Sequence, residues 1–120
     1  MEEKQLTNFL PLSRKLFTHE LWHEKRVYSK FEAWLDLLKE ARFDRTETRM
    51  LIGNTIVRWG RGEIPASLRF LAERWGWSKN KADSFLKLLT NEGMISKRTA
   101  QGTAQTIITI CNYEDYQQNF

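Results

Sequence analysis

The spacing of apolar residues changes at Gly93 from a helical repeat to a strand repeat, and this change constrains the fold more than any other feature. In residues 79–92, apolar side chains recur every three or four positions, as on a helix with one buried face. Beyond Gly93, two β-prone runs at 94–98 and 106–110 are joined by a polar loop at 99–105. The pattern predicts a helix followed by a β-hairpin, and therefore an α+β fold.

A second helix is expected just before this one, at 67–75. Gly76 occupies the position at which helices commonly end in the left-handed conformation, and Ser78 offers an N-cap for the helix at 79–92. Two short helices joined by a glycine-containing turn and followed by a hairpin have the order of a winged helix-turn-helix. We predict a winged-helix domain over residues 9–117, with an N-terminal helical extension.

The extension and a further hairpin are visible as local patterns. Ser29 and Glu32 have capping-box spacing, which predicts a helix start, and a shorter helical turn is expected near Ser13. Two β-prone runs flank Gly53-Asn54, a two-residue link that favours a hairpin, and Glu63-Ile64 suggests another short extended piece. We expect the helix from Ser29 to bury Phe31, Trp34, Leu35, Leu37, Leu38 and Ala41. Its polar side is expected to carry Lys30, Asp36, Lys39 and Glu40.

The composition is that of one folded domain. Among the 120 residues, 41% are hydrophobic and 12% aromatic, which excludes wholesale disorder. No apolar run approaches the roughly 20 residues that span a bilayer, and the acidic N-terminus lacks a secretory signal. The single cysteine, Cys111, excludes an internal disulfide and a cysteine-rich metal site. We expect a soluble, cytoplasmic domain in which residues 1–8 are flexible and 112–120 form a polar tail.

Positive charge is concentrated in one part of the chain. The net charge is +4, but residues 58–105 alone hold nine basic and four acidic residues. This local excess is the electrostatic pattern of nucleic-acid binding. It falls on the segment that is expected to form the helix-turn-helix and the wing.

The helix at 79–92 is expected to present a polar outer face. At about 100° per residue, Ala82, Phe85, Leu86 and Leu89 gather on the inner face. The outer face has side chains that can contact phosphates and base edges in a major groove. Lys97, Arg98 and Gln101 lie on the expected wing, and Arg69 on the preceding helix. The predicted double-stranded DNA contacts are Arg69, Lys79, Asn80, Lys81, Ser84, Lys87, Lys97, Arg98 and Gln101.

One motif suggests metal chemistry instead. Residues 19–23, His-Glu-Leu-Trp-His, match the H-E-x-x-H pattern in which two histidines on one helix face bind zinc. A third ligand would have to be Glu40 or Glu47, and Lys25 and Arg26 directly follow the motif, which disfavours a cation. No other catalytic set is evident. We therefore expect no metal, no cofactor and no enzymatic activity, and we expect Trp75 and Trp77 to pack beneath the turn.

Three segments resemble a known family. They are Phe31-Glu-Ala-Trp-Leu-Asp-Leu-Leu38, the stretch 67–78, and Ile108-Thr-Ile-Cys-Asn-Tyr113 with Tyr116. The chain resembles the DnaD-like N-terminal winged-helix domains of bacteriophage and mobile-element replication-initiation proteins over residues 9–117. This resemblance implies DNA binding near a replication origin and recruitment of helicase-loading or other primosome proteins. It also implies homo-oligomers and a second domain, for which 118–120 would be the linker.

Two other functions fit the same sequence. A transcriptional regulator would use the same DNA-binding surface. A protein-interaction or oligomerisation module would instead use Trp22, Trp59 or the hairpin at 50–57 as its contact surface, with the basic face incidental.

Overall fold

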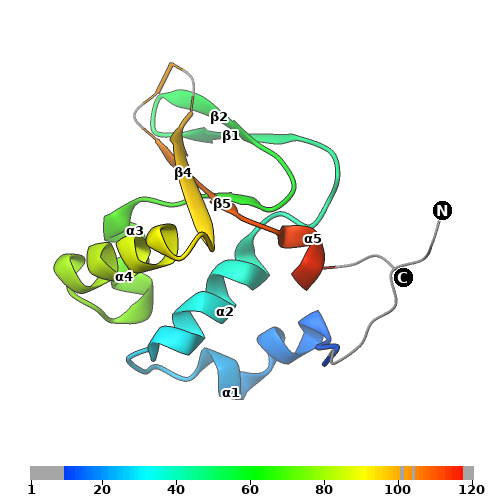
Figure 1. Cartoon of the computed structure of the whole chain (residues 1–120), viewed down its shortest axis with the longest axis vertical. Coiled ribbons are helices and arrows are strands. Elements are labelled where there is room, and N and C mark those ends of the chain that lie inside the picture. The colour runs from blue at the N-terminus through cyan, green and yellow to red at the C-terminus, as the bar shows by residue number, and fades with distance from the viewer. Residues whose placement is uncertain (1–9, 101, 104, 118–120) are drawn as a thin grey trace.

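The computed structural model describes residues 10–100, 102–103 and 105–117, and these form an α+β chain with two small antiparallel sheets (Figure 1). The helical elements are the 3-10 turn η1 (Arg14–Thr18), α1 (Glu20–His23), α2 (Lys30–Glu40), α3 (Leu68–Trp75), α4 (Lys79–Asn91) and α5 (Tyr113–Tyr116). The strands are β1 (Thr48–Ile52), β2 (Thr55–Trp59), β3 (Glu63–Pro65), β4 (Ile95–Thr99) and β5 (Thr106–Ile110). The expected flexible segment 1–8 and the tail residues 118–120 lie outside the described residues. Among the described helices, none is long and apolar enough to cross a membrane.

The larger sheet has the strand order β3–β5–β4, with all pairs antiparallel. The central strand pairs Ile108 with Ile64 on one side and with Lys97 on the other. Between β3 and β4 the chain forms α3 and α4, so the helix pair is inserted between two strands of one sheet. The smaller sheet is the β1–β2 hairpin, which lies beside the far end of the β4–β5 hairpin (Figure 1).

Both faces of the larger sheet are covered, because side chains alternate along a strand. Ile108 and Ile110 face the helices and join the main core with Leu71, Trp75 and Phe85. Ile107 points the other way and packs with Val57 of β2 and Ala100 in a second, smaller core. The β1–β2 hairpin therefore docks on the sheet face that the helices leave free.

The turn between α3 and α4 confirms the local predictions. Gly76 has φ 71° and donates to carbonyls of the last turn of α3, which is the left-handed helix end that favours glycine. The Ser78 hydroxyl accepts from the Lys81 N–H at 3.1 Å and so caps α4. Trp75 and Trp77 are buried, and each makes an edge contact with Phe85. The turn is thus held from below by aromatic packing.

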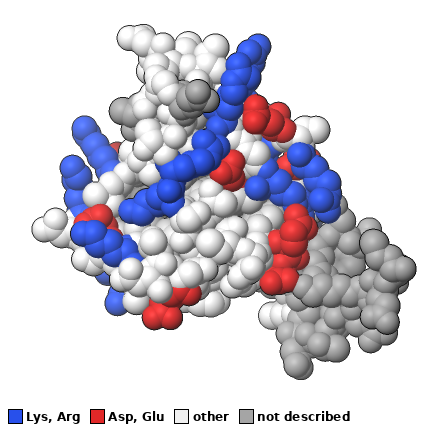
Figure 2. Space-filling view, turned by 45° about the horizontal axis from the view of Figure 1, so that its top comes forward, with Lys and Arg blue, Asp and Glu red and all other residues white. Residues whose placement is uncertain are grey.

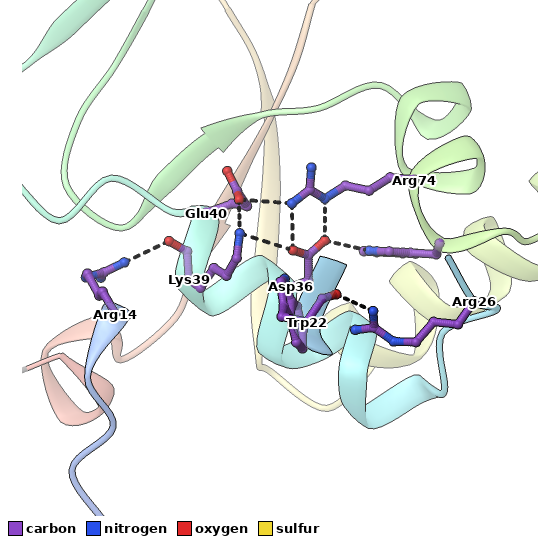
Figure 3. Close-up of polar contacts among 8 residues, drawn as sticks. Arg14, Trp22, Arg26, Asp36, Lys39, Glu40 and Arg74 are labelled. Atoms are coloured by element: carbon purple, nitrogen blue, oxygen red, sulfur yellow. Dashed lines mark hydrogen bonds and ion pairs between the residues drawn. The ribbon is translucent and has the colours of Figure 1, made fainter. Parts of the chain in front are cut away.

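Helix α2 begins as predicted and buries Leu37, Leu38 and Ala41 as expected, but two assignments on it are wrong. The capping box between Ser29 and Glu32 is present. The prediction that Asp36 lies on the polar side is wrong, because this residue is 1% exposed, and Phe31, expected in the core, is 70% exposed. A buried carboxylate is tolerated only where partners compensate its charge. Here Arg74 and Trp75 of α3 are these partners, because both donate to the Asp36 carboxylate, so Asp36 can lie on the buried side of α2 (Figure 3).

The segment after β5 is more ordered than the expected polar tail. Residues Tyr113–Tyr116 form α5, and Tyr113 is buried in the main core. Arg61 pairs with Glu114 at 2.5 Å and lies over the Tyr113 ring. A Cβ on Gly62, which has φ +75°, would come within 3.0 Å of the Tyr113 side chain. Contacts with residues about fifty positions earlier therefore determine this helix.

Candidate nucleic-acid interface

Helix α4 separates its side chains into the two predicted faces. Ala82, Phe85, Leu86 and Leu89 are all buried in the main core. Around the opposite side, the exposed residues include Lys79, Asn80, Lys81, Ser84 and Lys87. Packing of these four apolar residues fixes the orientation of the outer face, which also carries Leu88, an apolar side chain that is 45% exposed.

The first turn of α4 gathers unpaired cations and a helix N-terminus. Lys79 and Lys81 are exposed, and in the described part of the chain neither forms an ion pair. The Lys81 ammonium lies 4.5 Å from the Trp77 ring centroid, a cation–π contact that restrains the side chain without neutralising it. The partial positive charge of the helix N-terminus adds to these cations. This turn can therefore attract an anion such as a phosphate.

Further along the same face, Lys87 is partly compensated. Its ammonium lies 2.9 Å from the Asp83 carboxylate, one helical turn earlier. This hydrogen bond lowers the pKa of Asp83, and the charge of Lys97 on β4 contributes in the same direction. Lys97 pairs with Ile108, whose side chain faces the helices, so it extends the basic surface from the helix to the strand. Asn80 and Ser84 are neutral, exposed members of this surface.

Lys97 and Arg98 were both predicted on the wing, and in the structure they lie on opposite faces of the sheet. Lys97 pairs with Ile108 on the helix side, whereas Arg98 pairs with Ile107 on the side of the β1–β2 hairpin. The Arg98 guanidinium binds both carboxylate oxygens of Glu63 at 3.0 Å. This bond is the main reason that the pKa of Glu63 is lowered from 4.5 to about 2. Arg98 thus ties β4 to β3 and is less available to DNA than Lys97.

The remaining predicted contacts are peripheral. Arg69 lies on the exposed side of α3 and pairs with Glu73 at 3.2 Å, with both side chains largely in solvent. Such a pair contributes little to stability and exchanges readily for another anion. Gln101 lies outside the described residues.

The structure also shows residues that sequence reasoning missed. Arg74 bridges α2 and α3, donating to Asp36 at 2.6 and 2.9 Å and to Glu40 at 2.9 Å (Figure 3). Its pKa is raised, first by the hydrogen bond to Asp36. Trp75 donates to the same carboxylate at 2.9 Å. This network positions the helix pair on α2, and the signal that could have indicated it is the acid within the apolar run of α2.

The histidines do not share a helix face. His19 precedes α1 and caps it, with its Nδ1 accepting from the Leu21 N–H at 3.1 Å. Only His23 lies within the four-residue helix. No cluster of three potential metal ligands occurs in the part of the chain that the structure describes. The geometry that the H-E-x-x-H motif requires is therefore not formed here.

Basic side chains run in a band across one face of the molecule (Figure 2). In this view the band descends diagonally, further cations lie along the left edge, where α3 and α4 lie, and most acidic side chains gather to the right and below. The strands contribute four cations, Arg49, Arg58, Lys97 and Arg98, against the single acid Glu63. Comparison with protein-family models, curated protein sequences and solved structures finds no match for this chain.

Proposed function

We propose that this chain is a winged-helix DNA-binding domain. In this interpretation α3 and α4 are the helix-turn-helix, α4 is the recognition helix and the β4–β5 hairpin is the wing. The sheet order β3–β5–β4 supports it, and so does the element order α2–β1–β2–β3–α3–α4–β4–β5, in which the β1–β2 hairpin is inserted between α2 and β3. The single observation that carries the proposal is the outer face of α4, where Lys79 and Lys81, which have no ion-pair partner among the described residues, lie beside neutral hydrogen-bonding side chains.

These side chains would make different kinds of contact with DNA. The first turn of α4 would enter the major groove, with Lys79 and Lys81 on flanking phosphates. Asn80 and Ser84 would contact base edges, which carry the sequence information. Lys97 would reach phosphate from the wing side. Lys87, Arg69 and Arg98 would bind more weakly, because each has an acidic partner that DNA must displace.

The biological role we propose is replication initiation in a phage or mobile element. It rests on the resemblance of the Phe31–Leu38, 67–78 and Ile108–Tyr113 segments to DnaD-like domains. Helicase-loading or other primosome proteins are the partners that this role implies. A transcriptional regulator would use the same α4 surface. An α4 variant that stops replication of an origin plasmid, without changing transcription from an adjacent promoter, would separate the two roles.

The test of DNA binding is fluorescence anisotropy across a salt series. Duplexes would first be selected from a random-sequence pool and then compared with scrambled versions. Each lost phosphate contact reduces the log–log salt slope by about 1, so Lys79→Ala/Lys81→Ala should reduce it by about 2. Lys15→Ala, on η1 and exposed, is the control and should leave binding unchanged. Equal binding by the double variant and the wild type would overturn the proposal.

One specific observation supports the alternative, a protein-interaction module. Trp22 and Trp59 are half-buried by neighbouring residues, but Met50, Leu51 and Ile56 of the hairpin are 57%, 67% and 52% exposed. An interaction module would bind no DNA in the anisotropy assay. The hairpin also carries Arg49 and Arg58, and their positive charge favours binding of an anionic ligand over a protein contact.

A further inference from the structure

The β1–β2 hairpin presents a basic and apolar face away from the core. Its two-residue Gly53-Asn54 turn sets a register in which Arg49 lies opposite Arg58 and Leu51 opposite Ile56. These two pairs share one face, because residues two apart point the same way. The other face carries Val57, which is buried against Ile107 of the larger sheet. The outward face therefore has two arginines toward the base of the ribbon and two aliphatic residues toward its tip.

The arginine pair is electrostatically unfavourable in the isolated molecule. Like charges directly opposite each other on neighbouring strands destabilise the pairing. In the described part of the chain, neither guanidinium forms a hydrogen bond or ion pair. Both side chains are exposed. A ligand that supplies several negative charges along a line would relieve this repulsion, and a nucleic-acid backbone does so.

The hairpin is also joined to the wing side of the proposed DNA surface. Arg98 of β4 donates to the Arg58 carbonyl at 3.2 Å. A hollow of about 300 Å³ between the two hairpins is lined by Glu47, Ile56, Arg58, Arg98 and Ala100. Among the described residues of this lining, Glu47 is the one acid, and Arg58 and Arg98 are the two cations. Arg49, Arg58, Lys97 and Arg98 thus add exposed cations on two neighbouring hairpins to those of α4.

We propose that the β1–β2 hairpin is a second DNA-binding arm, which contacts the same duplex beyond the site of α4. Arg49 and Arg58 would bind phosphates beside the minor groove, where arginine is attracted by the enhanced negative potential. Leu51 and Ile56 would press against the base steps as an apolar wedge, which bends DNA. This inference rests on the proposed function, because α4 positions the duplex.

The separate positions of the hairpin and α4 agree with two contacts on one duplex. The hairpin lies at one end of the long axis of the molecule, and α4 lies away from that end (Figure 1). DNA that binds both elements must therefore be longer than DNA that binds α4 alone.

The experiment compares duplexes of about 12 and about 24 base pairs, roughly one and two helical turns. For Arg49→Ala/Arg58→Ala, affinity for the long duplex should fall about tenfold or more, and its salt slope by about 2. Affinity for the short duplex should stay at the wild-type value. Arg49→Lys/Arg58→Lys keeps the charge and should restore most of the salt slope. Leu51→Thr/Ile56→Thr removes the apolar bulk while leaving residues that favour strands, and it should reduce bending, measured by energy transfer between dyes at the duplex ends.

The outcomes separate this inference from the function on which it rests. If Arg49→Ala/Arg58→Ala binds the long duplex like the wild type while Lys79→Ala/Lys81→Ala does not, the arm is refuted and the α4 surface stands. Loss of a protein partner in that case would identify the hairpin as an interaction surface. If the wild type binds neither duplex, both proposals fail. Equal melting temperatures for the wild type and each hairpin variant would show that the folds are comparable.

Discussion

The α2–α3 junction and the first turn of α4 both carry positive charge, but the charges have opposite surroundings. Arg74 at the junction is bonded to Asp36 and Glu40, whereas Lys79 and Lys81 face solvent without an acidic partner in the described residues. A buried charge that loses its partner costs several kcal/mol, while an exposed charge costs little. The junction charge therefore stabilises the fold, and the α4 charges remain free for a ligand. The partner of a cation identifies its role better than the number of cations does.

The largest effect is expected at the junction. Asp36→Ala would leave the Arg74 guanidinium half-buried and the Trp75 N–H without its acceptor, and should destabilise the protein by about 3–5 kcal/mol. Urea denaturation followed by tryptophan fluorescence measures this. Asp36→Asn keeps an acceptor for Trp75 and should cost less. If both variants changed the free energy of unfolding by under about 0.5 kcal/mol, the value of an ordinary surface substitution, the contrast between the two regions would disappear.

The next effect concerns Glu63, a second paired charge. Its folded pKa of about 2 lies below the ordinary 4.5, so its ion pair contributes stability above pH 4.5. That contribution should be lost as the pH falls from 4.5 to 2. Arg98→Ala should remove about 1 to 2 kcal/mol at neutral pH, because Arg98 is partly exposed.

Melting temperatures across this pH range provide the check. Arg98→Ala should flatten the acid dependence, since Glu63 would titrate closer to its ordinary pKa. An acid dependence as steep as that of the wild type would assign the pH effect to other carboxylates.

The turn that joins the two regions should show a similar or smaller effect. Gly76 has φ +71°, and a Cβ there would meet its nearest neighbours at 3.5 Å, an ordinary contact. The cost of Gly76→Ala is therefore backbone strain, about 1 kcal/mol. Gly76→Val should cost more, because a β-branched residue strains this conformation further. Thermal unfolding of the two variants tests this order. Gly93→Ala, also at φ +71° but with open space around it, is the matched control and should cost about as much as Gly76→Ala.

The smallest effect should appear within α4 itself. Lys87 is paired with Asp83, whereas Lys79 has no ion-pair partner among the described residues. Lys87→Ala should therefore change DNA affinity and salt slope less than Lys79→Ala. Asp83→Asn should strengthen binding slightly by freeing Lys87. Anisotropy with the same duplex compares the three variants, and a larger loss for Lys87→Ala would contradict the rule that unpaired cations dominate.

A separate measurement distinguishes specificity from charge on this helix. Asn80→Ala and Ser84→Ala remove no charge, so the salt slope should stay the same. They should relax discrimination between the selected and scrambled duplexes, by about 1–3 kcal/mol for a lost base contact. Unchanged discrimination would mean that these side chains do not face base edges.

Sequence reasoning succeeded where neighbouring residues decide the structure. Ser29 and Ser78 cap helices as predicted, and Gly76 ends α3 as expected. The Gly53-Asn54 link formed the predicted hairpin. The same register places Arg49 opposite Arg58, so the turn already implied that these two arginines are neighbours. It did not imply the role in DNA binding that we propose for them.

It failed where the deciding partner is distant. Asp36 was assigned to the polar side of α2 from helical spacing, whereas its partner Arg74 is 38 positions away. Lys97 and Arg98 were expected to act together, yet alternation along β4 separates them, and Arg98 binds Glu63 from 35 positions away. Tyr113 was assigned to a tail, and Gly62 and Arg61 hold it in the core.

The sequence by itself thus determined the helix ends, the glycine turn, the hairpin register and the two faces of α4, because each depends on residues within a few positions of one another. Only the tertiary structure decided which charges are neutralised. Ion pairs such as Arg74–Asp36 and Arg98–Glu63 form between segments that meet after folding. Charge interactions fall steeply with distance and with exposure to water. The availability of a cation for DNA is therefore a property of the packed molecule, and a local pattern cannot reveal it.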